Sequence, residues 1–178
     1  MRKKISIVTS LALAFSAIAF IAPQGAQAEC KPTKATGKTV GSISIGSTSS
    51  LIKPFNYPAG GTMEPQKTTS VASLSERHMP LSSSVGTSVI LWHRDYQGCV
   101  HPLNTFMSKK VGDTFSITDE NGESKRYRLT TVGVIKKGEY KKSWFTLIGP
   151  RQIAMFTCTG VFKSGHYEKN MVFIAVPA

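Results

Sequence analysis

Acidic residues are scarce in this sequence, which has 10 Asp and Glu against 22 Lys and Arg and a formal net charge of +12. It also has no Arg-rich helical segment and no motif that interleaves aromatic and basic residues as RNA-binding modules do. These absences argue against nucleic acid as a partner. The excess of cations would favour peripheral contact with an anionic envelope polymer or lipid, unless it is an ordinary solvated surface.

Cysteine is equally scarce, since Cys30, Cys99 and Cys158 are the only three and no two of them form a CxxC pair. Without such a pair, a zinc site assembled from Cys99, Cys158, His93 and His101 is not supported, and neither a metal nor a cofactor is expected. An odd number of thiols leaves one unpaired. A disulfide between Cys30 and Cys99 would leave Cys158 free.

Long apolar runs are limited to one segment at the N-terminus. Residues 1–4 (MRKK) are positively charged, residues 5–22 are mostly apolar, and residues 26–28 (AQA) form an Ala-x-Ala cleavage pattern. Together they predict a signal peptide over residues 1–28 that is cleaved on export. The alternative is an uncleaved membrane anchor, because 18 apolar residues are near the minimum for a spanning helix. Either reading places the protein outside the cytoplasm, in the cell envelope or secreted.

The remainder, residues 29–178, is long enough for one domain. Its first part, 29–84, reads as a flexible lead-in, the first strands, and a long Ser-rich loop with at most a short helix near 71–77. Alternating apolar residues and a hairpin signal at 119–122 predict further strands. The predicted strands are 40–45, 51–57, 87–92, 114–118, 125–134, 144–148, 152–157 and 171–176. About eight short strands and almost no helix predict a closed β-barrel with short helical turns.

Two of the predicted strands end on residues that suit thiol chemistry. Residues 152–158 form an apolar segment that ends on Cys158, and residues 88–92 form another that is followed by His93. A thiol and an imidazole held at strand ends can act together as nucleophile and acid–base group. Other histidines compete for this role: His78, His101 and, as the main rival, His166.

Several segments, in order, resemble the sortases, cysteine transpeptidases of bacterial cell envelopes. Residues 86–95 (GTSVILWHRD) are similar to the family's strand before its His, with Trp92 in place of the usual Gly. Residues 111–115 (VGDTF) with 127–131 (YRLTT) resemble its Val-Gly-Asp and Tyr-x-Val segments. Residues 156–158 (FTC) resemble a degenerate Thr-Leu-x-Thr-Cys signature, and 170–175 (NMVFIA) the last strand. The likeness covers the second half of the chain, about 85–175, and residues 85–178 would be the catalytic half of the barrel.

This resemblance implies a sortase-like barrel in which Cys158 attacks a sorting-signal peptide and His93 transfers protons. The thioacyl group would pass to an amine of peptidoglycan or of a pilin. The chain departs from the family in having no Arg after Arg151. Lys169 or Asn170 stands where the family's Arg falls, and either would stabilise the oxyanion or the substrate. The departure leaves two alternatives open, a non-catalytic binding module of the same fold and a thiol hydrolase.

Overall fold

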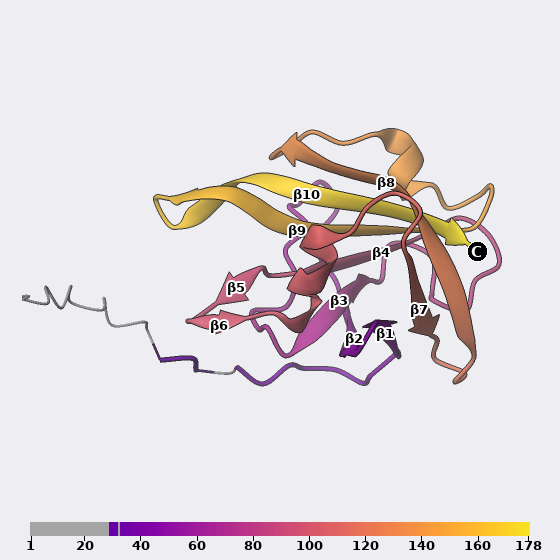
Figure 1. The fold of residues 1–178 in the computed structure, drawn as a ribbon, viewed down its shortest axis with the longest axis horizontal. Helices are drawn as coiled ribbons and strands as arrows, with labels where there is room; N and C mark the ends of the chain where they lie inside the picture. The colour runs from indigo at the N-terminus through magenta and orange to yellow at the C-terminus, as the bar shows by residue number, and fades with distance from the viewer. Residues whose placement is uncertain (1–28, 32) are drawn as a thin grey trace, which may run out of the picture.

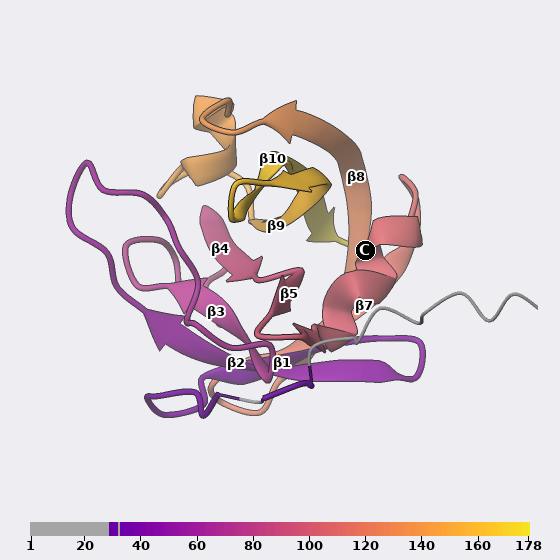
Figure 2. The ribbon, with the colours of Figure 1, turned by 90° about the vertical axis from the view of Figure 1, so that its left-hand side faces the viewer.

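The computed structural model of the protein describes residues 29–31 and 33–178, so the signal peptide predicted over 1–28 lies outside the described residues. Eight strands close into a barrel in the order β1-β2-β3-β4-β9-β10-β8-β7 (Figure 2). This architecture confirms the predicted mostly β barrel. The barrel strands are β1 (Gly41–Ile45), β2 (Thr48–Phe55), β3 (Val71–Ser75), β4 (Thr87–Trp92), β7 (Thr114–Thr118), β8 (Ser124–Lys136), β9 (Gln152–Lys163) and β10 (His166–Pro177). The short pair β5 (Asp95–Tyr96) and β6 (Cys99–Val100) and the 3-10 helices η1 (Pro102–Ser108) and η2 (Lys142–Phe145) complete the fold.

Side-chain alternation along β9 divides the apolar residues into two layers. Ile153 and Met155 face the cluster inside the barrel, which also contains Trp92. Ala154 and Phe156 face a second cluster outside the barrel, which η2 covers with the Trp144 side chain. Because successive side chains of a strand point to opposite faces, the outer face of β9 continues from Phe156 to Cys158. The outer cluster therefore leads directly to the predicted nucleophile.

The strands β9 and β10 form a long hairpin that extends beyond the barrel at one end (Figure 1). Its two-residue turn, Ser164–Gly165, has φ angles of 51° and 83°, which is the conformation that tight hairpins favour. The prediction that Cys158 ends its strand was wrong, because β9 continues to Lys163. The predicted turn former, Gly160, instead adopts a φ of 85° within the strand, beside a register shift in the pairing with β10.

Two other segments differ from the prediction. The region expected to be at most a short helix, near 71–77, contains β3, whose five residues are all buried between β2 and β4. Its serines are tolerated in the core because their hydroxyls have hydrogen-bond partners. Ser73 Oγ accepts from the main-chain N–H of Gln66, and Ser75 Oγ is hydrogen-bonded to His78 Nδ1. The strand expected at 144–148 is absent. The 3-10 helix η2 ends within this segment, at Phe145, and places the Trp144 ring in the outer cluster.

A disulfide joins Cys30 to Cys99, across 69 positions of sequence. It fastens the N-terminal segment to β6, and the Lys31 amide donates to the Gln97 carbonyl beside it. Cys158 is a free thiol. Over the part of the chain that the structure describes, no helix has both the length and the apolar character needed to cross a membrane.

Candidate active site

Parallel pairing of β4 with β9 brings Cys158 and His93 together. Trp92 is aligned with Thr157, and the Thr157 hydroxyl donates to the Trp92 carbonyl at 2.9 Å, which fixes the two strands at this point. The next residue of each chain is His93 on one side and Cys158 on the other. Both line the same cavity on the outer face of the sheet, which has a volume of about 470 Å³.

Both apolar and ionisable side chains line the cavity. Phe156 and Leu91 of the outer cluster are among the apolar ones, together with the exposed Phe162 of the β9–β10 hairpin. Residues 62–65 of the loop between β2 and β3 also line it. The long Ser-rich loop expected from the sequence thus contributes to this cavity. The ionisable lining residues are Glu64, His93, Arg94, Asp95, Tyr96, Lys137, Cys158, His166 and Tyr167.

Lys137 supplies a positive charge to Cys158 from a third strand. Its Nζ lies 3.6 Å from the Cys158 sulfur. Lys137 directly follows β8, in which Ile135 is aligned with Asn170 of β10 and packs against the outer cluster. By alternation Lys137 shares the face of Ile135. Sequence reasoning missed this residue, because the only signal for it was its spacing of two from Ile135.

The structure separates the two candidates for the position of the family's Arg. Asn170 is the cross-strand partner of Cys158 and lines the cavity. Lys169, one position earlier, is aligned with Thr159 and Lys136, does not line the cavity, and lies 3.5 Å from the Glu168 carboxylate. Adjacent residues of a strand face opposite ways, so only Asn170 shares the face of Cys158. Its amide is neutral, and the cation nearest the thiol is Lys137 rather than a residue of β10.

The surroundings of His93 favour the neutral imidazole. Burial lowers its pKa below the ordinary value of 6.5, and this outweighs the opposing effects of the Glu64 charge, the Pro65 carbonyl and the Asp95 charge. The Tyr96 ring stacks on the imidazole with a centroid separation of 5.2 Å. His93 Nε2 is buried without a hydrogen-bond partner among the described residues. A neutral imidazole can accept a proton from an incoming group or share one with a neighbouring thiol.

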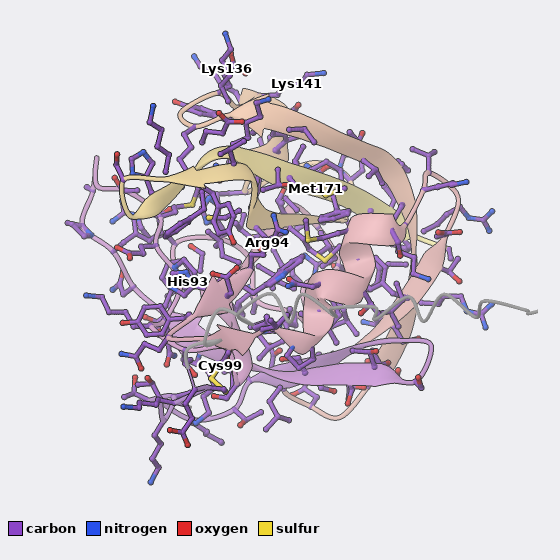
Figure 3. The ribbon with its side chains drawn as sticks, turned by 60° about the vertical axis from the view of Figure 1, so that its left-hand side comes forward. His93, Arg94, Cys99, Lys136, Lys141 and Met171 are labelled. Carbon is purple, nitrogen blue, oxygen red and sulfur yellow. A yellow bond between two sulfur atoms is a disulfide. The ribbon has the colours of Figure 1, made fainter. Side chains whose placement is uncertain are left out.

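Residues on either side of the cavity mouth are linked to each other. The Tyr167 hydroxyl donates to the Asp95 carboxylate, and the Arg94 guanidinium lies 5.0 Å from the centre of the Tyr167 ring. Burial and the Asp95 carboxylate raise the pKa of the Tyr167 hydroxyl. Figure 3 shows Arg94 and His93 on the same side of the molecule. These contacts connect the β9–β10 hairpin to the chain segment that carries His93.

The competing histidines lie in other settings. His166 lines the cavity from the hairpin but is exposed, with its Nδ1 near the Ser164 carbonyl. His101 is buried and caps η1, since its Nδ1 accepts from the Leu103 amide at 3.0 Å. His78 bonds Ser75 and does not line the cavity. Within residues 29–31 and 33–178, no three His, Cys, Asp or Glu side chains are grouped as a metal site requires.

Comparison with known proteins finds a matching family model and several similar solved structures. A model of the sortase domain matches residues 44–178. Among solved structures, sortase A from Corynebacterium diphtheriae superposes with a TM-score of 0.61 at 18% identity, over 82% of this chain and 63% of that one. The pilus-related sortase C of Group B Streptococcus gives a TM-score of 0.60 at 17% identity, covering 81% and 69% of the two chains. Sortase C from Clostridium perfringens SM101 gives 0.57 at 16% identity, covering 80% and 71%.

At these identities the structural likeness concerns the fold, and the present chain spans less than two thirds of the Corynebacterium protein. A search of curated proteins found no match. The match to the family model, in contrast, extends over most of the chain, from β1 to the C-terminus. It includes all the strands that carry the cavity residues. On this basis the chain belongs to the sortase family.

Proposed function

We propose that this chain is a cysteine transpeptidase that cleaves a sorting-signal peptide and transfers the acyl part to an envelope amine. The observation that carries the proposal is the grouping of a free thiol, an imidazole and an ammonium in one cavity. Cys158 lies within β9, whereas His93 directly follows β4 and Lys137 directly follows β8. All three line the same cavity. A buried structural cysteine would need neither a cavity nor a cation beside it.

The first step is attack of the Cys158 thiolate on the carbonyl carbon of the scissile peptide bond. The Lys137 ammonium lies 3.6 Å from the sulfur, close enough to attract negative charge there. As the C–S bond forms, negative charge develops on the carbonyl oxygen. Asn170, which lines the cavity as the cross-strand partner of Cys158, and Lys137 are the groups that would stabilise it. The C–N bond then breaks, and His93, which took the proton of the Cys158 thiol when the thiolate formed, gives that proton to the leaving amine.

The second step transfers the acyl group. An amine attacks the thioester carbonyl, the neutral His93 takes the proton of that amine, and the C–S bond breaks to release the Cys158 thiolate. The His93 that gave up its proton in the first step is the base required in the second. The substrate we propose is an extended peptide resembling Leu-Pro-x-Thr-Gly, cut between Thr and Gly. The acceptor would be an amine of peptidoglycan or the Lys of a pilin.

We place the protein outside the cytoplasm, in the envelope or secreted, with residues 29–178 as one domain after a signal peptide. The Cys30–Cys99 disulfide supports this location, because such bonds persist in oxidising compartments. The basic composition would also favour peripheral contact with anionic envelope components.

Intact-mass analysis tests the proposal. The protein is incubated with sorting-signal peptides, with and without triglycine, alongside the Cys158→Ala variant. A thioacyl adduct or peptide cleavage that depends on Cys158, with a triglycine product, is the expected result. Cleavage that gives only the carboxylic acid would indicate a thiol hydrolase. Neither adduct nor cleavage over a panel of peptides would favour a binding module and contradict the proposal.

A further inference from the structure

Two residues, Tyr96 and Pro65, neighbour the His93 imidazole, and both belong to parts of the chain with little regular structure. The Tyr96 ring stacks on it from β5. Pro65, in the loop between β2 and β3, lines the same cavity as the imidazole, and its main-chain carbonyl raises the pKa of His93 against the effect of burial. The strands β5 and β6 have only two residues each, and the loop has no regular structure around Pro65. Neither neighbour is therefore fixed by the barrel alone.

The N-terminal segment is attached to the first of these neighbours. Cys30 is disulfide-bonded to Cys99, the cross-strand partner of Tyr96. The Lys31 amide donates to the Gln97 carbonyl at 3.2 Å, and the Thr33 hydroxyl donates to the Gln97 side chain at 2.9 Å. Figure 1 shows this segment running below the β5–β6 hairpin, and Figure 3 marks Cys99 with its disulfide. The hairpin is thereby anchored at the turn next to Tyr96.

The same segment is attached to the second neighbour through Gln66. The Thr36 amide donates to Gln66 Oε1 at 2.9 Å, and Gln66 Nε2 donates to the Thr36 carbonyl at 3.1 Å. Gln66 Nε2 also donates to the Pro54 carbonyl of β2 at 2.8 Å. The main-chain N–H of Gln66 donates to Ser73 Oγ of β3 at 3.0 Å. The residue directly after Pro65 is thus bonded to two barrel strands and to the N-terminal segment.

We infer that the described residues between Cys30 and Gly37, here called the N-terminal strap, position His93 by fixing both of its neighbours at once. The Cys30–Cys99 disulfide is one attachment of the strap and Gln66 is the other. Gln66 is a positioning residue, because it acts on the imidazole only through Pro65. Acid–base catalysis depends on an imidazole held in the correct orientation, and a displacement of about 1 Å can lower a rate about a hundredfold. The inference rests on the proposed role of His93.

The test uses two variants of the full exported chain, Gln66→Ala and the double variant Cys30→Ser/Cys99→Ser. Gln152→Ala is the matched control. Its side-chain amide also holds an irregular segment, through hydrogen bonds to Thr87 Oγ1 and the Ser143 carbonyl, but it lies at the start of β9, away from His93. The ring ¹H and ¹⁵N chemical shifts of His93 are measured by NMR in each protein, together with kcat and KM for acyl transfer.

In both strap variants we expect the His93 shifts to move toward the average of the two tautomers. We also expect kcat to fall about tenfold or more, with KM changed less than about twofold. Gln152→Ala should leave the His93 shifts as they are in the wild type. If Gln66→Ala does not fold, Gln66→Glu replaces it, because the carboxylate keeps the acceptor for the Thr36 amide and loses both donors.

Unchanged His93 shifts in the strap variants would overturn the inference, and so would a change in only one of them. A change of equal size in Gln152→Ala would also overturn it, since the effect would then be a general loosening of the fold. The NMR measurement does not need a substrate. If the wild type transfers no acyl group but the shifts respond as expected, the proposed function fails and the role of the strap stands.

Discussion

The Lys137 ammonium lies 3.6 Å from the Cys158 sulfur, although the two residues are 21 positions apart. Lys137 directly follows β8, which does not pair with β9, the strand of Cys158. The strand between them, β10, contributes Asn170, which is neutral. In this chain the positive charge at the thiol therefore comes from the end of β8, and β10 contributes an amide donor. Separate substitutions can distinguish the two contributions.

Replacement of Lys137 by Met should slow alkylation of Cys158 by iodoacetamide at pH 7 by about fivefold, the effect of one unit charge at this distance in a solvated site. Lys137→Arg should retain most of the rate, because the charge is kept. Lys136→Met is the control, since Lys136 is aligned with Lys169 and faces away from the thiol. An equal loss of rate in Lys136→Met would mean that only the overall charge matters.

Asn170→Ala should lower kcat for acyl transfer by about a hundredfold, the typical cost of removing one oxyanion donor. Alkylation of Cys158 should change little, because iodoacetamide reacts by displacement and forms no tetrahedral oxyanion. Stopped-flow kinetics of both reactions in the same preparation separate the effects. Lys169→Ala should leave both rates near those of the wild type, and a large loss in that variant would contradict the assignment of faces.

Burial lowers the pKa of His93, so its NMR titration should have a midpoint below 6.5. The Glu64 charge opposes this shift, and Glu64→Gln should therefore lower the midpoint further. Glu76, an exposed carboxylate that does not line the cavity, provides the control in Glu76→Gln. A midpoint that rises in Glu64→Gln would show that the carboxylate does not act on the imidazole through its charge.

His101 should make the fold sensitive to acid. Burial lowers its pKa to about 4, whereas the unfolded chain protonates near 6.5. Between these values the unfolded state binds more protons, so stability is full above about pH 6.5 and falls as the pH drops toward 4, by about 3 kcal/mol in total. Asn at this position can still cap η1 but does not titrate. Urea unfolding of His101→Asn from pH 7 to pH 4 should show a flatter profile than the wild type, and equal slopes would contradict this account.

The barrel and the pairing of Cys158 with His93 were accessible from the sequence because both depend on local patterns. Apolar segments of strand length precede each residue, and the family motifs occur in the right order. Lys137 was not accessible, because its place depends on the register of β8, β10 and β9 together. The choice between Lys169 and Asn170 required the same information, since adjacent positions face opposite sides and the sequence does not reveal which side is outward.

The secondary-structure errors have similar causes. The strand β3 (VASLS) is rich in serine and follows a polar stretch, and its burial depends on partners such as Gln66 that lie outside it. The segment around Trp144 has strand-like composition, but its large ring is buried by a 3-10 turn. In both cases tertiary contacts outweighed local propensity.

The placement of the three cysteines also bears on oxidative folding. Three thiols allow three different single disulfides, and only the Cys30–Cys99 bond leaves the proposed nucleophile intact. A chain that crosses a membrane N-terminus first exposes Cys30 and Cys99 before Cys158, which is in the ninth of ten strands. The native bond can therefore close before the third thiol arrives. On export in this direction, the order of the cysteines along the chain would protect Cys158 from mispairing.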